Sequence, residues 1–595
     1  MRILRGIILT IIWAQHLHAK PMNIVWIVIE DASPDIGCYG ETAIKTPNMD
    51  QMAEDGIRFT HAFVTSPVCS PSRSAMISGM YPVTLGAHNH SSQNTGGKGK
   101  GGPAYHKSYR VPVKLVPELF RDAGYFVTNN GKTDYNFIPP RGLYDGSSWK
   151  KAKNDQPIFA QFQLRGGKNR EAPGHCDPAA VQLPPYYPEH PVIRQDWAKY
   201  LDSWVQTDKE VGQILAALEA AGRLDSTAVF LWTDHGVSHL RGKQFLYEEG
   251  IRIPLIISLP DKQKAGSLRN DIIEHIDIAA TSLALAGIEI PDYVRGRDFL
   301  AADHVPRDHL FAARDRCDET VDIIRAVRDE RFKYIRNFMS HVPHAQPNRY
   351  KDKKIIVQTI RELNAKGKLN ELQARPFACH RPPEELYDLE EDPNETTNLA
   401  TDPNHLDRLL AMRELTYSRM LKERDMGLIP EPILEDLGRK AGTKYDAFLK
   451  TNHNKQTKLL VEVITAGEAN DTNSLMAFTE SKDPSARYWA AVWLGVNKTP
   501  DAKTVLKKLL TDETPAVKLA AAQSLVKLGD KEYLKLLIHQ INDPNYLLGM
   551  YALRAIEELG DEGKAYKQEI SAAQNSPYEF SRRIATRLMN RWAEN

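Results

Sequence analysis

Two nearly unbroken apolar runs in the first half of the chain predict buried strands. One extends from Met22 to Ile29 and the other from Ala228 to Thr233, and both are rich in β-branched or aromatic residues. A run without polar alternation is typical of a central strand that is covered by helices on both faces. The pattern therefore indicates an α/β sheet near the beginning of the chain.

A polar pair follows each run at the point where the strand is expected to end. The first pair is Glu30-Asp31 and the second is Asp234-His235. In α/β folds the ligands lie beyond the carboxyl ends of the strands. We therefore expect the four side chains to meet at one edge of the sheet.

Further strands and helices alternate around these two runs. Strands are predicted at residues 125–128, 158–163 and 253–257, and helices at 113–123 and 204–221. This alternation predicts a mixed or mostly parallel sheet with helices on both faces. Residues 327–337 and 385–389 resemble strands of a smaller antiparallel unit.

The last part of the chain contains three similar blocks. They start at Asp483, Asp512 and Asp543, and each combines an Ala/Leu stripe with a terminal glycine; the glycines are Gly495, Gly529 and Gly560. Such a period of about 30 residues, with a start and a stop signal, indicates stacked helical pairs. The blocks resemble HEAT repeats, with residues 576–590 as a final capping unit.

Composition and charge describe an ordinary globular protein. The 595 residues contain 77 Lys and Arg against 76 Asp and Glu, with 42% hydrophobic residues. A net charge of +1 argues against a nucleic-acid partner. Five scattered cysteines are too few for a disulfide framework.

The N-terminal segment predicts export. Arg2 and Arg5 precede an apolar run that ends near Ala14, which is the pattern of a signal peptide and too short for a permanent span. We expect a periplasmic or extracellular protein with no membrane span. The predicted domains are a signal peptide at 1–19, an α/β core at 20–300, a smaller α+β subdomain at 301–404, a helical connector at 405–454 and the repeats at 455–595.

The most informative segment surrounds Cys69. The sequence Cys69-Ser70-Pro71-Ser72-Arg73 places a thiol before a helix-forming stretch, with a guanidinium four residues later. A helix N-terminus and a nearby cation both lower the pKa of a thiol and both hold anions. The pattern favours a reactive cysteine over an inert one.

This segment resembles the C-x-P-S-R signature of the type I sulfatases. Four more landmarks follow the order of that family: the acidic pair at 30–31, Gly131-Lys132, the Thr233 to Gly236 motif with Lys243 after it, and ELYDLEEDPNETTNLA from Glu385. The resemblance covers residues 22–400. It implies an alkaline-phosphatase-like α/β fold and a sulfuric ester hydrolase.

The resemblance also assigns roles to particular residues. It implies that a formylglycine-generating maturation enzyme oxidises Cys69 to formylglycine, the nucleophile, which Arg73 and Lys132 hold while Lys243 contacts the sulfate. The implied metal ligands are Glu30, Asp31, Asp234 and His235. Calcium is the expected ion, although Glu30 and the His235 nitrogen leave room for another divalent metal.

Two family histidines have no counterpart in this chain. Asp134 stands where the family often has the base that eliminates sulfate, and the segment after residue 163 lacks the histidine that protonates the leaving group. Asp134 remains a candidate base. Lys168, Arg165 and His175 are the alternatives for the acid.

Further candidate catalytic and substrate-binding residues lie near these motifs in the sequence. His239 lies between the metal pair and Lys243 and is a candidate catalytic residue, and His88 and His90 are candidates for the sulfate pocket. Substrate recognition is also predicted for Arg314-Asp315-Arg316, since such charged forks suit carboxylate, sulfate or hydroxyl groups. A salt-bridged turn explains that segment equally well.

The sequence thus predicts an exported sulfatase that degrades a sulfated oligo- or polysaccharide. Two alternatives stay open. The first is a phosphate or phosphonate ester hydrolase of the same superfamily. The second is an inactive relative that binds sulfated glycans and uses the repeats for protein binding or oligomerisation.

Overall fold

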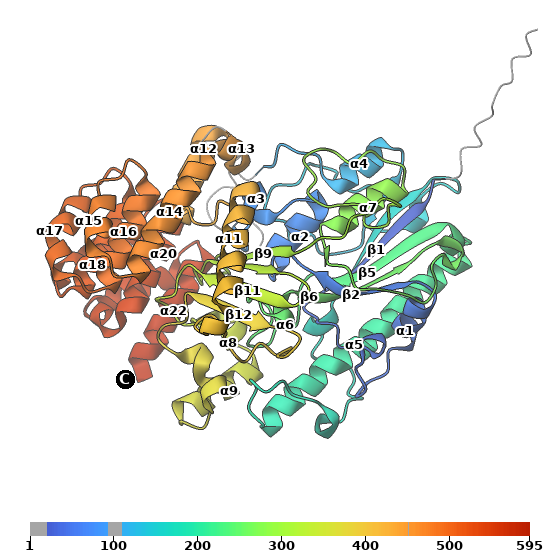
Figure 1. The fold of residues 1–595 in the computed structure, drawn as a ribbon, viewed down its shortest axis with the longest axis horizontal. Helices are drawn as coiled ribbons and strands as arrows, with labels where there is room; N and C mark the ends of the chain where they lie inside the picture. The colour runs from blue at the N-terminus through green and yellow to red at the C-terminus, as the bar shows by residue number, and fades with distance from the viewer. Residues whose placement is uncertain (1–20, 93–109, 450–451, 595) are drawn as a thin grey trace, which may run out of the picture.

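The computed structural model describes residues 21–92, 110–449 and 452–594. An α/β core occupies one end of the molecule, an array of helices the other, and a small sheet lies between them (Figure 1). The predicted signal peptide lies outside the described residues. Within the described ranges, no helix has both the length and the apolar character that crossing a bilayer would require.

The core is built on one mixed sheet of eight strands, as the sequence predicts. The strands are β1 (Asn23–Ile29), β2 (Ile57–Phe63), β3 (Phe126–Asn129), β4 (Ile158–Leu164), β5 (Thr227–Thr233), β6 (Arg252–Ser258), β7 (Ser267–Arg269) and β8 (Ile273–Glu274). Their order is β3-β4-β1-β5-β6-β2-β7, with β8 also paired to β2. Strands β3, β4, β1 and β5 are parallel, and β6 runs against both of its neighbours. Strand β2 was not predicted, because three of its seven residues are polar.

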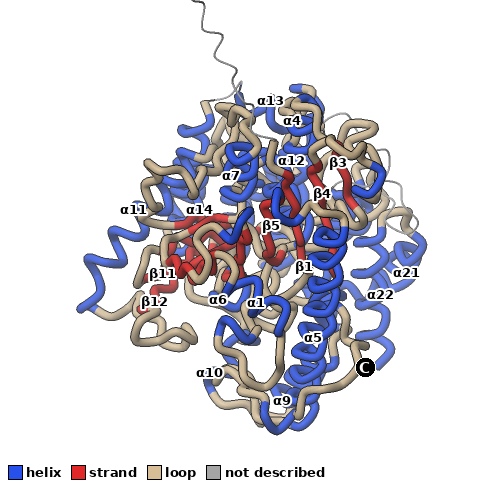
Figure 2. Tube along the Cα trace, turned by 90° about the vertical axis from the view of Figure 1, so that its right-hand side faces the viewer, coloured by secondary structure: helices blue, strands red, loops and turns tan. Residues whose placement is uncertain are grey.

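Helices cover both faces of this sheet. Helices α1 (Pro47–Glu54) and α5 (Pro191–Ala220) lie on one face, and α2 (Cys69–Ser78), α4 (Val116–Asp122) and α7 (Asp277–Leu285) lie on the other (Figures 1 and 2). Successive side chains of β1 point to opposite faces. Val25 and Ile27 therefore pack with the α5 side, and Trp26 and Val28 with the α4 side. The unbroken apolar run is explained by this double burial.

The smaller unit is an antiparallel sheet, also as predicted. Its strands β9 (Leu310–Arg314), β10 (Ile324–Arg328), β11 (Phe332–Asn337) and β12 (Glu384–Asp388) are arranged in the order β12-β11-β10-β9. Helices α8 (Arg349–Asp352), α9 (Ile355–Ala365) and α10 (Glu371–Ala374) lie between β11 and β12 along the chain.

Helices and short loops make up the described residues after β12. The connector contains α11 (Leu406–Lys422), α12 (Glu431–Ala441) and α13 (Lys444–Leu449). The array contains α14 (His453–Glu468), α15 (Thr472–Phe478), α16 (Pro484–Val496), α17 (Lys503–Leu509), α18 (Pro515–Lys527), α19 (Leu534–Gln540), α20 (Tyr546–Leu559), α21 (Lys567–Ala572) and α22 (Glu579–Glu594).

Gly495 does not end a helix of the repeats, although the sequence pattern predicted that it would. Gly529 and Gly560 adopt positive φ values just after α18 and α20, as stop signals do. Gly495 instead lies inside α16, where an added Cβ would come within 2.3 Å of Ser524 Oγ on α18. Its function is therefore close helix packing, and its interpretation as a helix stop was wrong.

Candidate active site

The candidate site lies at the carboxyl edge of the parallel strands. Ile29 of β1 pairs with Thr233 of β5, so the polar residues that follow both strands start side by side. The backbone N–H of Asp31 donates to Asp234 Oδ1 at 3.0 Å. Strands β3 and β4 end at the same edge and lead to Lys132 and Lys168. Adjacent parallel strands thus deliver the charged groups. The sequence predicted this for the pairs after β1 and β5 and not for the two lysines.

Cys69 is the first residue of α2 and its side chain is buried among cations. Its Sγ atom lies 2.9 Å from Lys243 Nζ, 3.6 Å from Lys168 Nζ and 3.2 Å from His235 Nε2. Burial raises the pKa of the Cys69 thiol, but the charges of Lys132, Lys168 and Lys243 outweigh burial and hold the pKa well below its usual value. The start of α2 is therefore a site for a negative charge.

Three of the predicted metal ligands form one cluster around this sulfur. The ligand atoms of Asp31, Cys69, Asp234 and His235 all lie within 4.8 Å of one another. His235 Nδ1 lies 2.9 Å from the carbonyl oxygen of Gly236, which can only accept a hydrogen bond, so Nε2 is left to face the cluster as a ligand. Burial raises the pKa of Asp31, but Lys168 and Lys243 outweigh burial and hold it below the usual range. The carboxylate is therefore ionised.

Glu30 and Arg73 stand beside the cluster. Arg73 is fully buried, and its Nε donates to Asp234 Oδ2 at 3.0 Å while Nη1 donates to Gln163 Oε1 at 2.6 Å. The Glu30 carboxylate forms ion pairs with Arg73, Lys132 and Lys168. Arg73 thus fixes a ligand of the cluster, and Glu30 neutralises the cations around it.

A cavity of about 430 Å³ opens from this cluster. Its wall includes Lys132 and Asp134, whose side chains form a 3.3 Å ion pair. A carboxylate oxygen of Asp134, a ring nitrogen of His90 and the Cys69 sulfur lie within 4.8 Å of one another. Asp134 also has a positive φ of 52°, an uncommon conformation for a residue other than glycine. The backbone at this edge is therefore held in a specific, strained shape.

The structure brings only some of the predicted histidines to the cavity. His90 lines it, and its Nδ1 lies 3.1 Å from Asp318 Oδ1. His88 is buried elsewhere, with its Nδ1 unpartnered within the described part of the chain. His239 is also buried, and its Nε2 contacts Asp196 Oδ2 at 3.2 Å. Neither lies among the residues that line the cavity.

The charged segment 314–316 forms buried ion pairs rather than a wall of the cavity. Arg314 pairs with Asp322, Asp315 with Arg325 and Arg316 with Glu431. None of the three predicted residues is among those that line the cavity. Arg316 does hold the adjacent loop, since its Nη1 donates to the carbonyl oxygen of His90 at 3.0 Å.

Among the alternatives for an acid near the leaving group, only Lys168 is close to the sulfur. Arg165 and His175 are exposed. Lys168 Nζ pairs with Glu30 and lies 3.5 Å from Asp31 Oδ1. The short helical turn Gly166–Lys168 after β4 determines this position.

Tyr350 lies at the site and was not predicted. Its Oη donates to Asp31 Oδ2 at 2.6 Å, and Lys243 Nζ lies 4.3 Å from the centre of its ring. It belongs to α8, in a polar segment without a recognisable pattern. Gln244 and four residues near the C-terminus also line the cavity unpredicted; these are Tyr578, Glu579, Phe580 and Arg583.

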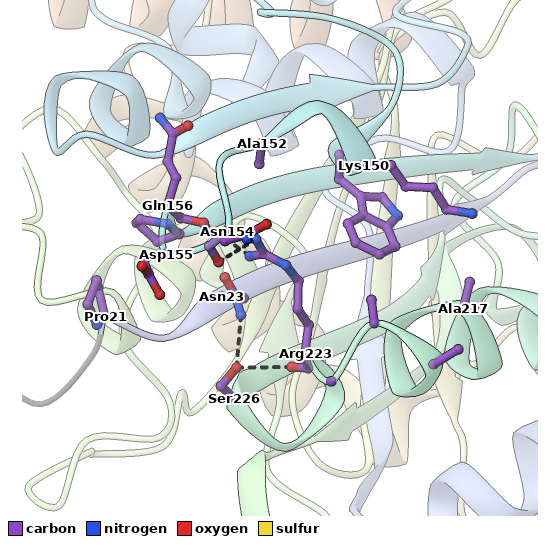
Figure 3. A pocket seen from close by; sticks show the side chains of 15 residues that line it. Pro21, Asn23, Lys150, Ala152, Asn154, Asp155, Gln156, Ala217, Arg223 and Ser226 are labelled. Carbon is purple, nitrogen blue, oxygen red and sulfur yellow. Dashed lines mark hydrogen bonds between the residues drawn. The ribbon is translucent and has the colours of Figure 1, made fainter.

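A second, larger cavity lies away from these groups. It has a volume of about 730 Å³ and is lined by residues near the amino ends of the parallel strands, including Asn23, Pro157 and Ser226 (Figure 3). In Figure 3 Arg223 points toward the loop of Asn154, where its Nη2 donates to backbone carbonyls at 3.0 Å. Ligands in α/β folds bind at the opposite edge of the sheet. This cavity is therefore a weaker candidate despite its size.

The fold and the site together define a class of protein. A buried thiol at a helix start, an Asp-Asp-His cluster and three lysines at the carboxyl edge of a mixed α/β sheet suit an enzyme that hydrolyses an anionic ester.

Comparison with known proteins identifies the family. The sulfatase family model matches residues 22–163 and 147–288, the model of the C-terminal part of N-sulphoglucosamine sulphohydrolase matches 235–354, and the HEAT repeat model matches 472–576. An ulvan-active sulfatase of Formosa agariphila is 34% identical over 438 residues, which cover 66% of this chain and 73% of the relative. Human N-sulphoglucosamine sulphohydrolase is 23% identical, over 70% and 94% of the two chains.

Solved structures agree at the level of the fold. A structure named as a sulfatase from Bacteroides thetaiotaomicron has a TM-score of 0.50 at 20% identity and covers 68% of this chain and 93% of its own. A phosphonate monoester hydrolase from Silicibacter pomeroyi also reaches 0.50, at 17% identity, over 68% and 96% of the two chains. The chain belongs to the sulfatase family and is a sulfuric ester hydrolase with C-terminal HEAT repeats.

Proposed function

We propose that this sulfatase removes sulfate from a sulfated carbohydrate, with formylglycine derived from Cys69 as its nucleophile. The observation that carries the proposal is the environment of Cys69: a buried Sγ atom at a helix start, with Lys243 and Lys168 within 3.6 Å, at one end of a cavity of about 430 Å³. The names of the relatives support the substrate class, since they include an ulvan-active sulfatase and N-sulphoglucosamine sulphohydrolase.

The residues present fit a divalent cation and a converted Cys69. Asp31 and Asp234 offer carboxylate oxygens, and His235 offers a nitrogen whose orientation is set by its second hydrogen bond. Calcium suits the oxygen ligands best. Hydrated formylglycine would supply the attacking oxygen, and the cation would neutralise charge on the sulfate.

The surrounding cations hold the substrate and the nucleophile. Sγ of Cys69 stands in for the oxygens that the same Cβ would carry after conversion. Lys243 Nζ lies 2.9 Å from that position, so its protons reach both the nucleophile and a sulfate oxygen beside it. Arg73 is fully buried and pairs with Asp234. It therefore keeps that carboxylate in place.

Asp134 and Lys168 supply the proton transfers in this proposal. Asp134 has a carboxylate oxygen within 4.8 Å of the sulfur, close enough to take a proton from position 69 directly or through one water molecule. Lys168 approaches the sulfur from β4, and an ammonium group there can donate a proton to the leaving oxygen. The two residues thus replace the histidines that the family often uses.

We also propose that the enzyme works outside the cytoplasm, in the periplasm or the medium. The support is the N-terminal pattern of Arg2 and Arg5 before a short apolar run. Fractionation of the producing cells and N-terminal sequencing of the mature chain test this. An unprocessed cytoplasmic protein would contradict it.

Conversion and catalysis are tested at position 69. The protein is produced with a formylglycine-generating enzyme, and the tryptic peptide that contains position 69 is measured by mass spectrometry. We expect formylglycine and release of sulfate from at least one of three substrates: ulvan oligosaccharides, N-sulphoglucosamine and N-acetylgalactosamine 6-sulfate. Cys69→Ala should abolish the release while leaving the circular dichroism spectrum unchanged. Turnover by Cys69→Ala, or faster hydrolysis of matched phosphate esters, would refute the proposal.

A further inference from the structure

The last helix of the repeat array reaches the active-site cavity. Tyr578, Glu579, Phe580 and Arg583 line the same cavity as Cys69, more than 500 residues earlier in the sequence. Figure 1 shows α22 on the side of the array that faces the core. The array is therefore part of the site and not a separate appendage.

Ion pairs fix α22 to a loop that also lines the cavity. Arg583 Nη1 lies 3.3 Å from Asp318 Oδ2 and 3.1 Å from Glu319 Oε2. Arg587, one turn further along α22, pairs with Glu319 at 3.0 Å. Asp318 in turn contacts His90, which lines the cavity. The position of α22 is thus tied to the site by ion pairs.

The chemistry of this wall differs from that around Cys69. The catalytic end has three lysines around Cys69 together with Glu30 and Asp134, whereas the α22 end has two carboxylates, Asp318 and Glu579, with the cations Arg583 and His90. Burial lowers the pKa of His90, but Cys317 and Asp318 outweigh burial and keep its imidazole charged. Each carboxylate at this end is paired with a cation, since Asp318 contacts His90 and Arg583, and Glu579 contacts Arg583. Such a wall suits a neutral group with many hydroxyls better than a second anion.

The polar groups at this end are within reach of a ligand. The side chains of Arg583 and Glu579 are 15% and 21% exposed, and they form a 2.6 Å ion pair. Phe580 is buried behind them, with the guanidinium carbons of Arg316 and Arg583 at 5.3 and 5.2 Å from its ring centre. Carboxylates accept hydrogen bonds from sugar hydroxyls and a guanidinium donates them. Packing on the Phe580 ring holds the Arg583 guanidinium, and the ion pair with Arg583 holds the Glu579 carboxylate.

We propose that Tyr578 and the start of α22 form the subsite for the sugar ring that carries the scissile sulfate, with Glu579 and Arg583 as specificity-determining residues that bind its hydroxyl groups. The inference rests on the proposed carbohydrate sulfatase activity. It assigns the HEAT repeats a direct part in substrate selection. The ring of a small aryl sulfate has no hydroxyl groups for Glu579 and Arg583 to bind.

The test compares two substrates and three variants of the full-length, formylglycine-containing enzyme. The substrates are 4-nitrophenyl sulfate and whichever of the three sulfated carbohydrates the wild type hydrolyses fastest. Glu579→Gln keeps the shape of the glutamate side chain, and Arg583→Met keeps an apolar chain in place of the aliphatic part of the arginine. Arg587→Met is the matched control, since Arg587 also pairs with Glu319 but does not line the cavity.

We expect Glu579→Gln and Arg583→Met to raise KM for the carbohydrate about tenfold, with kcat/KM for 4-nitrophenyl sulfate changed by no more than about twofold. Arg587→Met should change neither substrate by more than about twofold. Equal losses on both substrates, or equal effects of Arg583→Met and Arg587→Met, would show a merely structural role and overturn the inference. A wild type active on 4-nitrophenyl sulfate but on no carbohydrate would instead refute the proposed function.

Discussion

At the scale of single residues, the site depends on how closely like charges are packed. Three ammonium groups surround one sulfur, which is tolerable only because Glu30 and Asp31 offset their charge. The substrate sulfate brings a further negative charge to this position. The resting site is therefore arranged for an anion before the substrate arrives.

Lys168 is the acid in the proposed mechanism, since its Nζ lies 3.6 Å from Cys69 Sγ. If it protonates the leaving oxygen, Lys168→Ala should lower kcat by a factor of about 10² to 10⁴ on carbohydrate sulfates. The effect should be smaller on 4-nitrophenyl sulfate, since its leaving group needs no proton. Arg165→Ala is the control, because Arg165 lies three residues before Lys168 and is exposed. Equal losses on both substrates would argue against an acid role.

His88 predicts a pH dependence of stability. Burial is the main cause that lowers its pKa from 6.5 to about 3, and Arg325 adds to the effect. The folded protein thus binds fewer protons than the unfolded chain, so stability is complete above pH 6.5 and falls as the pH drops toward 3. At pH 5 the free energy of unfolding is therefore lower by about 2 kcal/mol than it is well above pH 6.5.

The measurement is the midpoint of urea-induced unfolding at pH 7 and pH 5. His88→Gln, which has no proton to gain, should lose less stability over this interval than the wild type. His380→Gln provides the control, because His380 is exposed. An identical pH dependence in the His88 variant and the wild type would refute the assignment.

At the scale of elements, close packing between helices determines the array. Gly495 of α16 approaches α18 so closely that an added Cβ would lie 2.5 Å from the Cβ of Ser524. We expect Gly495→Ala to destabilise the protein by about 1 to 3 kcal/mol, despite the better helix propensity of alanine, because neither helix can move away freely.

Thermal unfolding of the Gly495→Ala variant measures the expected loss of stability. Gly146→Ala is the matched control, since an added Cβ there meets no atom within 4 Å. A Gly495→Ala variant as stable as the wild type would mean that the two helices separate at little cost.

At the scale of the whole molecule, the array and the small sheet share one hydrophobic cluster. It joins Phe311 and Tyr334 of the sheet to Met420 of the connector and to Trp489 and Trp493 of α16. Trp489 Nε1 also donates to the carbonyl oxygen of Leu428 at 2.8 Å. We therefore expect the array and the small sheet to unfold together.

Calorimetry tests this expectation with one substitution. Trp489→Ala should cost about 3 to 5 kcal/mol and shift one common transition to lower temperature. Leu536→Ala, at a position of the array that is 42% exposed, should leave the transition unchanged. Two separate transitions, of which only one responds to Trp489→Ala, would show that the array folds independently of the sheet.

The sequence by itself determined the class of fold and the catalytic end of the site. Hydrophobic runs identify β1 and β5 because both faces of a central strand are buried, and the residues after such strands must meet at one edge. The motif around Cys69 is local, so it could also be recognised from the sequence. The helical repeats were predicted from their period of about 30 residues, and the small antiparallel unit from the strand-like segments 327–337 and 385–389.

Only the tertiary structure decided which distant residues complete the site. Tyr350 and Arg583 carry no local signal, since their roles arise when separate elements pack against the core. Packing also buried His239 beside Asp196 and engaged Arg314 with Asp322, away from the cavity. A sequence pattern reports which faces are apolar, whereas contacts between elements depend on the docking of whole surfaces.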